Sequence, residues 1–68
     1  MEPERMIHMA NQIASFFAAY PKDEAVAGIT GHFKQFWEPR MRKQIIEYVA
    51  EGGGGLNELA VEAVKRLQ

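Results

Sequence analysis

The sequence has no cysteine among its 68 residues. This absence excludes disulfide frameworks, cysteine-based zinc sites, redox-active thiols and cysteine nucleophiles. The two histidines, His8 and His32, could form a structural zinc site only if several carboxylates converged on them. Because a chain this short buries only about 60% of the surface that its unfolded form exposes, an independent core would be marginal. We therefore expect either unusually good packing or a partner.

An excess of charge of one sign and long apolar runs are also lacking. Eight Lys and Arg residues stand against nine Asp and Glu residues, so the net charge of −1 creates no overall field for nucleic acid or an anionic membrane. No segment approaches the roughly 18 apolar residues that span a bilayer. The residues Met1–Arg5 lack the basic and apolar regions of a signal peptide. These features favour a cytoplasmic protein that binds neither nucleic acid nor membrane.

Proline and glycine divide the chain into four segments. The boundaries are Pro21, Pro39 and the glycine run 52–55, and no segment has the alternating pattern of a strand. The sequence therefore predicts an all-α fold, a bundle of about four short helices in one domain over residues 1–68. The expected helices cover residues 3–19, 24–37, 39–51 and 57–67.

Small and polar residues predict how these helices begin and end. Asp23 and Asn57 are the expected N-caps of the second and fourth helices. Gly52 is the expected left-handed cap of the third helix, and the three glycines after it predict a flexible link. Gly28 and Gly31 interrupt the second helix, which indicates either a locally weak helix or a close approach by another helix.

The first two helices carry more large apolar side chains than a small bundle easily buries. In each helix they share an arc of about 120° at 100° per residue. A surplus of this kind usually marks a surface that binds a protein partner. The two arcs comprise Met6, Met9, Ala10, Ile13, Phe16, Phe17 and Tyr20 in the first helix, and Ala25, Val26, Ile29, Phe33, Phe36 and Trp37 in the second.

Residue types that carry catalysis are present but scattered. The acidic residues occupy helix starts and exposed faces, and a full helix and a turn separate His8 from His32. Ser15 and Thr30 have no histidine one helical turn away to activate them. The glycine run is not followed by a Lys-Ser/Thr pair, so it is not a phosphate-binding loop. We expect no catalytic activity, metal or cofactor in this chain.

The stretch from Trp37 to Lys43 is the most suggestive of binding. It places three cations at a helix start, where the helix dipole disfavours positive charge. An anionic group opposite them would relieve this conflict. The alternative is a solvated basic face offset by Glu38 and Glu47.

The sequence resembles the delta subunit of NAD-dependent formate dehydrogenase over nearly its whole length. The most specific strings are Met-Ala-Asn-Gln-Ile at residues 9–13 and Phe-Trp-Glu-Pro-Arg-Met-Arg at residues 36–42. Further similarity covers residues 16–21, 24–29 and 62–67 and the glycine-rich turn. The pair Asn57-Glu58 departs from the family's Asp-Pro helix start but keeps the capping chemistry.

This resemblance implies a non-catalytic accessory subunit of a cytoplasmic multisubunit enzyme. In such complexes the alpha subunit carries a molybdenum or tungsten bis-pterin-guanine-dinucleotide centre and iron–sulfur clusters. The beta and gamma subunits carry FMN and further clusters and pass electrons to NAD. A delta subunit without cysteine supplies no thiolate ligand for a cluster. Its implied task is to bind the alpha subunit, so that the assembly or its cofactor-loaded state is stabilised.

Together, the resemblance and the residues predict which side chains bind the partner. Trp37 and Met41 are the expected apolar anchors, and Arg40 and Arg42 the expected partners of acidic groups. Hydrogen bonds are expected from the polar face of the first helix, from His8, Asn11 and Gln12. Two alternatives stay open at this point: a self-associating helical protein, such as a homodimer, and a small nucleic-acid-binding module that uses the same arginines.

Overall fold

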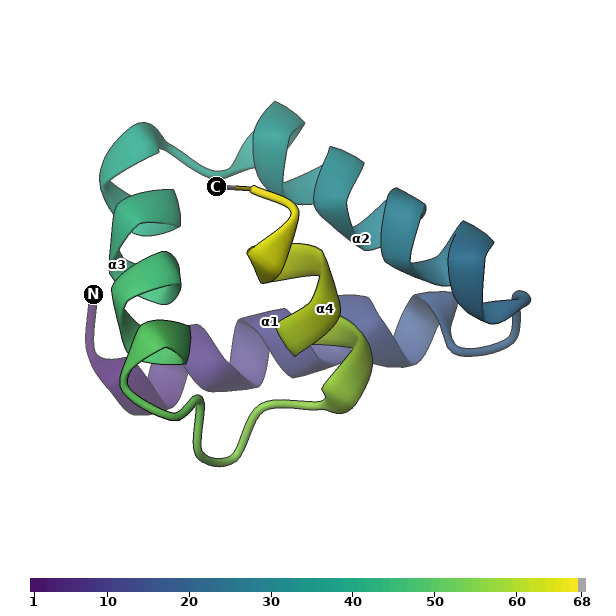
Figure 1. Cartoon of the computed structure of the whole chain (residues 1–68). Helices are drawn as coiled ribbons and strands as arrows, with labels where there is room; N and C mark the ends of the chain where they lie inside the picture. The colour runs from purple at the N-terminus through teal and green to yellow at the C-terminus, as the bar shows by residue number, and fades with distance from the viewer. Residues whose placement is uncertain (68) are drawn as a thin grey trace.

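The computed structural model describes residues 1–67 and contains four helices in that range (Figure 1). The prediction of an all-α fold is confirmed. Each helix end lies within two residues of the expected position. The helices are α1 (Pro3–Phe17), α2 (Lys22–Phe36), α3 (Pro39–Ala50) and α4 (Glu58–Lys65).

Prolines determine where three of the helices begin. Pro3 and Pro39 open α1 and α3, where the missing N–H group of proline has no intrahelical partner to lose. Pro21 is the N-cap of α2, and its carbonyl oxygen accepts a hydrogen bond from the backbone N–H of Ala25 at 2.8 Å. The expected Asp23 cap is therefore wrong: Asp23 lies inside the first turn of α2, where its charge complements the helix dipole.

The C-terminus of α3 is closed by glycine as predicted. Gly52 has a φ of 126°, and its N–H donates to the carbonyl oxygen of Val49 at 3.0 Å. The N–H of Gly53 donates to the carbonyl oxygen of Tyr48 at 3.0 Å. This pair of bonds is the Schellman pattern, which satisfies carbonyl groups at the end of a helix.

The glycine loop after α3 is held in place, so the expected flexible link is wrong. The side-chain amide of Asn11 on α1 donates to the carbonyl oxygen of Gly55 at 2.9 Å and accepts from the N–H of Asn57 at 2.8 Å. The Tyr48 hydroxyl donates to the carbonyl oxygen of Gly54. Asn57 caps α4 as predicted, because its side chain accepts from the N–H of Leu59. Side chains of α1 and α3 thus fix the start of α4.

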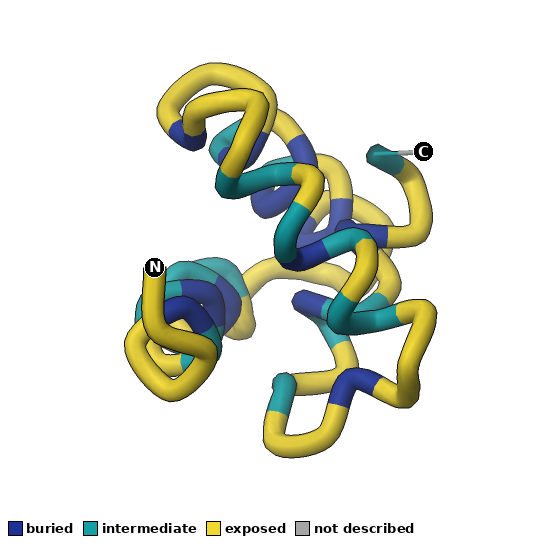
Figure 2. The backbone as a smooth tube through the Cα atoms, turned by 90° about the vertical axis from the view of Figure 1, so that its left-hand side faces the viewer, coloured by how far each residue is buried: buried dark blue, intermediate teal, exposed yellow. Residues whose placement is uncertain are grey.

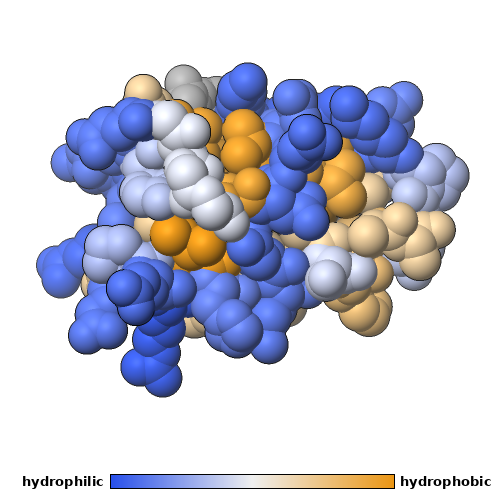
Figure 3. Space-filling model, turned by 90° about the horizontal axis from the view of Figure 1, so that it is seen from below, coloured by the Kyte–Doolittle hydropathy of each residue, from blue (hydrophilic) through white to orange (hydrophobic). Residues whose placement is uncertain are grey.

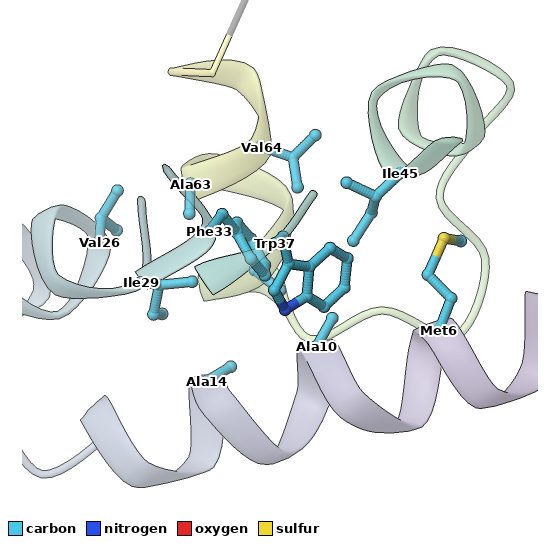
Figure 4. Packing of buried hydrophobic residues seen from close by; sticks show 11 residues of the cluster. Met6, Ala10, Ala14, Val26, Ile29, Phe33, Trp37, Ile45, Ala63 and Val64 are labelled. Atoms are coloured by element: carbon cyan, nitrogen blue, oxygen red, sulfur yellow. The ribbon is translucent and has the colours of Figure 1, made fainter. Parts of the chain in front are cut away.

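The core lies where the four helices meet (Figure 4). The short α4 packs against all three other helices, and the buried positions turn inward along every helix (Figure 2). Small residues in this core allow the helix backbones to approach closely. The core residues are Met6, Ala10, Ala14, Val26, Ile29, Phe33, Trp37, Ile45, Ala60, Ala63 and Val64.

Thr30 is the one polar residue buried within residues 1–67. Its hydroxyl donates to the carbonyl oxygen of Val26 at 2.8 Å and lies 3.3 Å from the carbonyl oxygen of Ala63 on α4. A buried hydroxyl without such acceptors would be destabilising. The contact therefore fixes the position of α4 against α2.

Candidate partner-binding face

The described residues hold no cluster of metal ligands. Among residues 1–67, no group of three His, Asp or Glu side chains comes close enough to bind a metal ion. His8 is exposed on α1, and His32 is half-buried on α2. No helix within this range is long and apolar enough to cross a membrane.

Trp37, expected as an exposed anchor, lies in the core. Only 4% of its surface is exposed, and its indole ring packs against the Phe33 ring at a centroid distance of 4.6 Å, with the two ring planes tilted by 57° (Figure 4). The ring fills the space between the end of α2 and the other helices. Trp37 therefore stabilises the core, and almost none of its indole surface is accessible to a partner.

Arg42 is also engaged inside the chain. Its guanidinium group donates to the carbonyl oxygens of Trp37 and, at 3.2 Å, Lys34. These carbonyls belong to the C-terminal turn of α2, the negative end of that helix dipole. The end of α2 therefore supplies negative charge opposite this cation at the start of α3, and no phosphate or carboxylate is needed for Arg42.

The remaining predicted site residues occupy two separate hollows. His8, Asn11 and Gln12 lie together along α1, although the amide of Asn11 is occupied by the glycine loop. Arg40 is exposed at the start of α3, beside the half-buried Met41, in a different hollow. The structure thus groups the three polar residues of α1 and separates them from the basic segment.

The structure exposes three aromatic residues of the two apolar arcs. Phe16 is 70% exposed, Tyr20 is 51% exposed and Phe36 is 66% exposed. Seen from below, side chains of moderate hydropathy gather at the end of the molecule where α1 turns into α2, and the most hydrophobic ones in this view lie nearer its middle (Figure 3). The expected surplus of apolar surface is present, but aromatic rings other than Trp37 provide it.

One of these rings, Phe16, borders a hollow between α1 and α2, which we call the aromatic groove. It has a volume of about 310 Å³ and is lined by Gln12, Ile13, Phe16, Phe17 and His32. Phe16 meets Phe17 edge to face at 5.2 Å between ring centroids, and His32 contacts Phe36 at 4.8 Å. No lining residue is a lysine, arginine, aspartate or glutamate, so the groove is suited to an apolar occupant.

Gly28 allows the Phe17 ring, which lines this groove, to lie close against α2. A Cβ atom at this position would lie closer than 3 Å to three carbon atoms of the Phe17 ring. At Gly31, by contrast, a Cβ atom would meet nothing within 4 Å. The close approach considered for the two glycines therefore occurs at Gly28, where the partner is an aromatic ring of α1.

Comparison with known proteins identifies the family to which the chain belongs. Residues 5–64 match the model of the NADH-dependent formate dehydrogenase delta subunit, FdsD. No curated protein and no solved structure matches the chain. The matched range includes all of α2 and α3, both sides of the aromatic groove and the glycine loop. The chain therefore belongs to the FdsD family of formate dehydrogenase delta subunits.

Proposed function

We propose that this chain is a non-catalytic subunit that binds the large alpha subunit of a cytoplasmic formate dehydrogenase. Membership of a delta-subunit family supports a role inside a complex of several subunits. In this proposal the molybdenum or tungsten centre, the iron–sulfur clusters and FMN reside in the other subunits. The chain has no cysteine, so it offers no thiolate ligand for an iron–sulfur cluster.

The exposed aromatic rings carry the proposal. Phe16 and Phe36 each leave about two thirds of their surface in water. Covering such a ring stabilises a complex by about 1–2 kcal/mol, in proportion to the 1.5–3 kcal/mol of a fully buried large side chain. Aromatic residues are enriched in the buried centres of protein interfaces. A partner subunit would supply this cover, and His8, Gln12 and Arg40 are proposed as polar contacts around it.

Binding would stabilise the alpha subunit by mass action. A partner that binds only the folded, cofactor-loaded form shifts the equilibrium toward that form by about 2.7 kcal/mol at a hundredfold excess over the Kd. The chain can thus raise the yield of loaded enzyme without taking part in the chemistry.

Co-expression tests the proposal. The alpha subunit is produced with and without the tagged chain, and we measure co-purification, the metal content of alpha and its thermal unfolding. We expect a stable complex, a higher content of molybdenum or tungsten and iron, and a raised Tm. An alpha subunit that fails to co-purify, with metal content and Tm unchanged, would overturn the proposal.

A further inference from the structure

We propose that a basic corner of the fold, formed by Lys34, Lys65 and Arg66 around Arg42, binds an acidic segment of the partner subunit. This inference rests on the proposed function, because it names the chemistry of the surface that the alpha subunit would present. It needs none of the exposed aromatic rings. Of the four residues, only Arg42 belongs to the segment that the sequence marks for binding.

Three helix ends bring these cations together. Near the start of α3, Arg42 donates from Nη1 to the carbonyl oxygens of Lys34 and Trp37, so this helix begins against the end of α2. Figure 1 shows the end of α4 on the same side of the molecule as the connection between α2 and α3. The side chains of Lys34, Lys65 and Arg66 are exposed there.

The packing of α4 against α2 places Lys34 and Arg66 at one end of this helix pair. The Thr30 hydroxyl lies 3.3 Å from the carbonyl oxygen of Ala63. Lys34 follows Thr30 by four residues and Arg66 follows Ala63 by three, so each cation lies one helical turn beyond this contact. The starts of the two helices line one hollow, so the helices run in the same direction. Their ends therefore present both cations together.

Charge is separated along the molecule, although the net charge is only −1. Glu47 belongs to the second half of α3, and Glu58 and Glu62 belong to the first five residues of α4. Glu38, in the connection between α2 and α3, lines the hollow at Arg40 instead. The corner therefore has a local positive field that the overall composition conceals.

Helix dipoles account for only part of this positive charge. The carbonyl groups at the end of α2 already accept hydrogen bonds from Arg42, so Lys34 is not needed to satisfy them. Exposed cations in the last turn of a helix contribute little to stability, and neighbouring like charges repel each other. Carboxylates placed opposite the corner would relieve this repulsion and would accept charge-assisted hydrogen bonds.

The surroundings of the corner favour a protein over a nucleic acid as the anionic partner. A phosphate backbone continues past the cations that bind it, and on α3 and α4 it would meet the exposed Glu47 and Glu62. A protein segment can place its carboxylates opposite the cations alone. The partner of the corner is therefore an acidic stretch of protein.

Two double variants with the same change in net charge test the corner. Lys34→Gln with Arg66→Gln removes two of its cations, whereas Arg5→Gln with Lys22→Gln removes two exposed cations elsewhere. At about 0.1 M salt we expect the corner variant to bind alpha roughly tenfold more weakly than the wild type, and the difference should shrink at about 0.5 M salt. The control variant should bind like the wild type. Equal binding by the two variants would overturn the inference.

The stability of the free chain distinguishes binding from folding. Removing two neighbouring like charges relieves repulsion, so the corner variant should unfold at the same urea concentration as the wild type or at a higher one. Weaker binding with an unchanged or raised midpoint would support a role in the interface. A lowered midpoint would show that these cations stabilise the helix ends, and the inference would then be wrong.

Zero-length cross-linking identifies the occupant of the corner. A carbodiimide joins a lysine amine directly to a carboxylate in contact with it. In the complex we expect Lys34 or Lys65 to be joined to an Asp or Glu of alpha, and the control Lys22 to form no bond with alpha. A bond only to a second copy of this chain, or no bond in the intact complex, would contradict the inference.

A labelled single-stranded oligonucleotide tests the rival partner. We expect it not to bind the chain, and binding in competition with alpha would overturn the assignment of the corner to a protein. Capture of alpha by the wild-type chain tests the proposed function separately, so that function stands even if the corner variant binds normally.

Discussion

Exchanging Asn11 for alanine should lower the stability of the fold without weakening binding to the partner. The Asn11 side chain makes two hydrogen bonds, at 2.9 Å to the carbonyl oxygen of Gly55 and at 2.8 Å from the N–H of Asn57. Each bond contributes about 0.5–1.5 kcal/mol, and water can replace part of that at this half-buried position. We therefore expect Asn11→Ala to lower the free energy of unfolding by about 1–2 kcal/mol.

Thermal and urea unfolding, followed by circular dichroism, measure this effect. A loss of 1 kcal/mol lowers the Tm of a domain of this size by about 4–8 °C. The neighbouring exposed residue provides the matched control: Gln12→Ala should change stability by less than about 0.5 kcal/mol. At temperatures where Asn11→Ala is folded, it should bind alpha like the wild type, while Gln12→Ala should bind more weakly. Equal stability of the two variants would refute the reasoning about the loop.

Three further predictions follow from the contacts within the chain. Arg42→Met should lower stability by about 1 kcal/mol in urea unfolding, because the last carbonyls of α2 lose a charged donor; an unchanged midpoint would contradict this. Trp37→Ala should cost about 3–5 kcal/mol, so the circular dichroism of the variant should indicate substantial unfolding at 25 °C. Gly31→Ala should raise the Tm, since alanine favours a helix by up to about 1 kcal/mol and meets open space; a lowered Tm would count against it.

The sequence was sufficient to predict the helices because local signals mark their ends. Pro3 and Pro39 can open a helix, Gly52 closes one, and Asn57 caps another, all through contacts within a few residues. The same local rules failed at Asp23, because Pro21 already provides the first carbonyl acceptor of α2.

The size of the apolar side chains predicted the buried face of α1 only in part. The buried residues are Met6, Ala10 and Ala14, of which the expected arc contains the first two, whereas Phe16 and Tyr20 of that arc are exposed. Phe16 lies about 120° around the helix from Ala10, which leaves its ring outside. Alanine contributes little to a hydrophobic pattern, but its small side chain allows α1 to pack closely against α4 and α2.

The roles of Arg42 and Asn11 depend on tertiary contacts that no local pattern contains. Arg42 reaches back across the turn to the end of α2, and Asn11 reaches a loop 44 residues away. The sequence shows that positively charged residues stand at the start of α3, where the helix dipole disfavours them, and it predicts a negative group opposite. The structure places such a group opposite Arg42. That group is a helix terminus of the same chain, which only the three-dimensional arrangement could reveal.

The long reach of Asn11 has a consequence for how the chain folds. With eight residues, α4 is too short to persist alone in water, so it forms when its N-terminal loop and its apolar face are both docked. Docking joins α1 to residues more than forty positions later, and the chain must lose the corresponding loop entropy before the contact stabilises it. We therefore expect α4 to assemble late on the route to the native state. Weakening the Asn11 contact should then accelerate unfolding while the folding rate stays nearly constant.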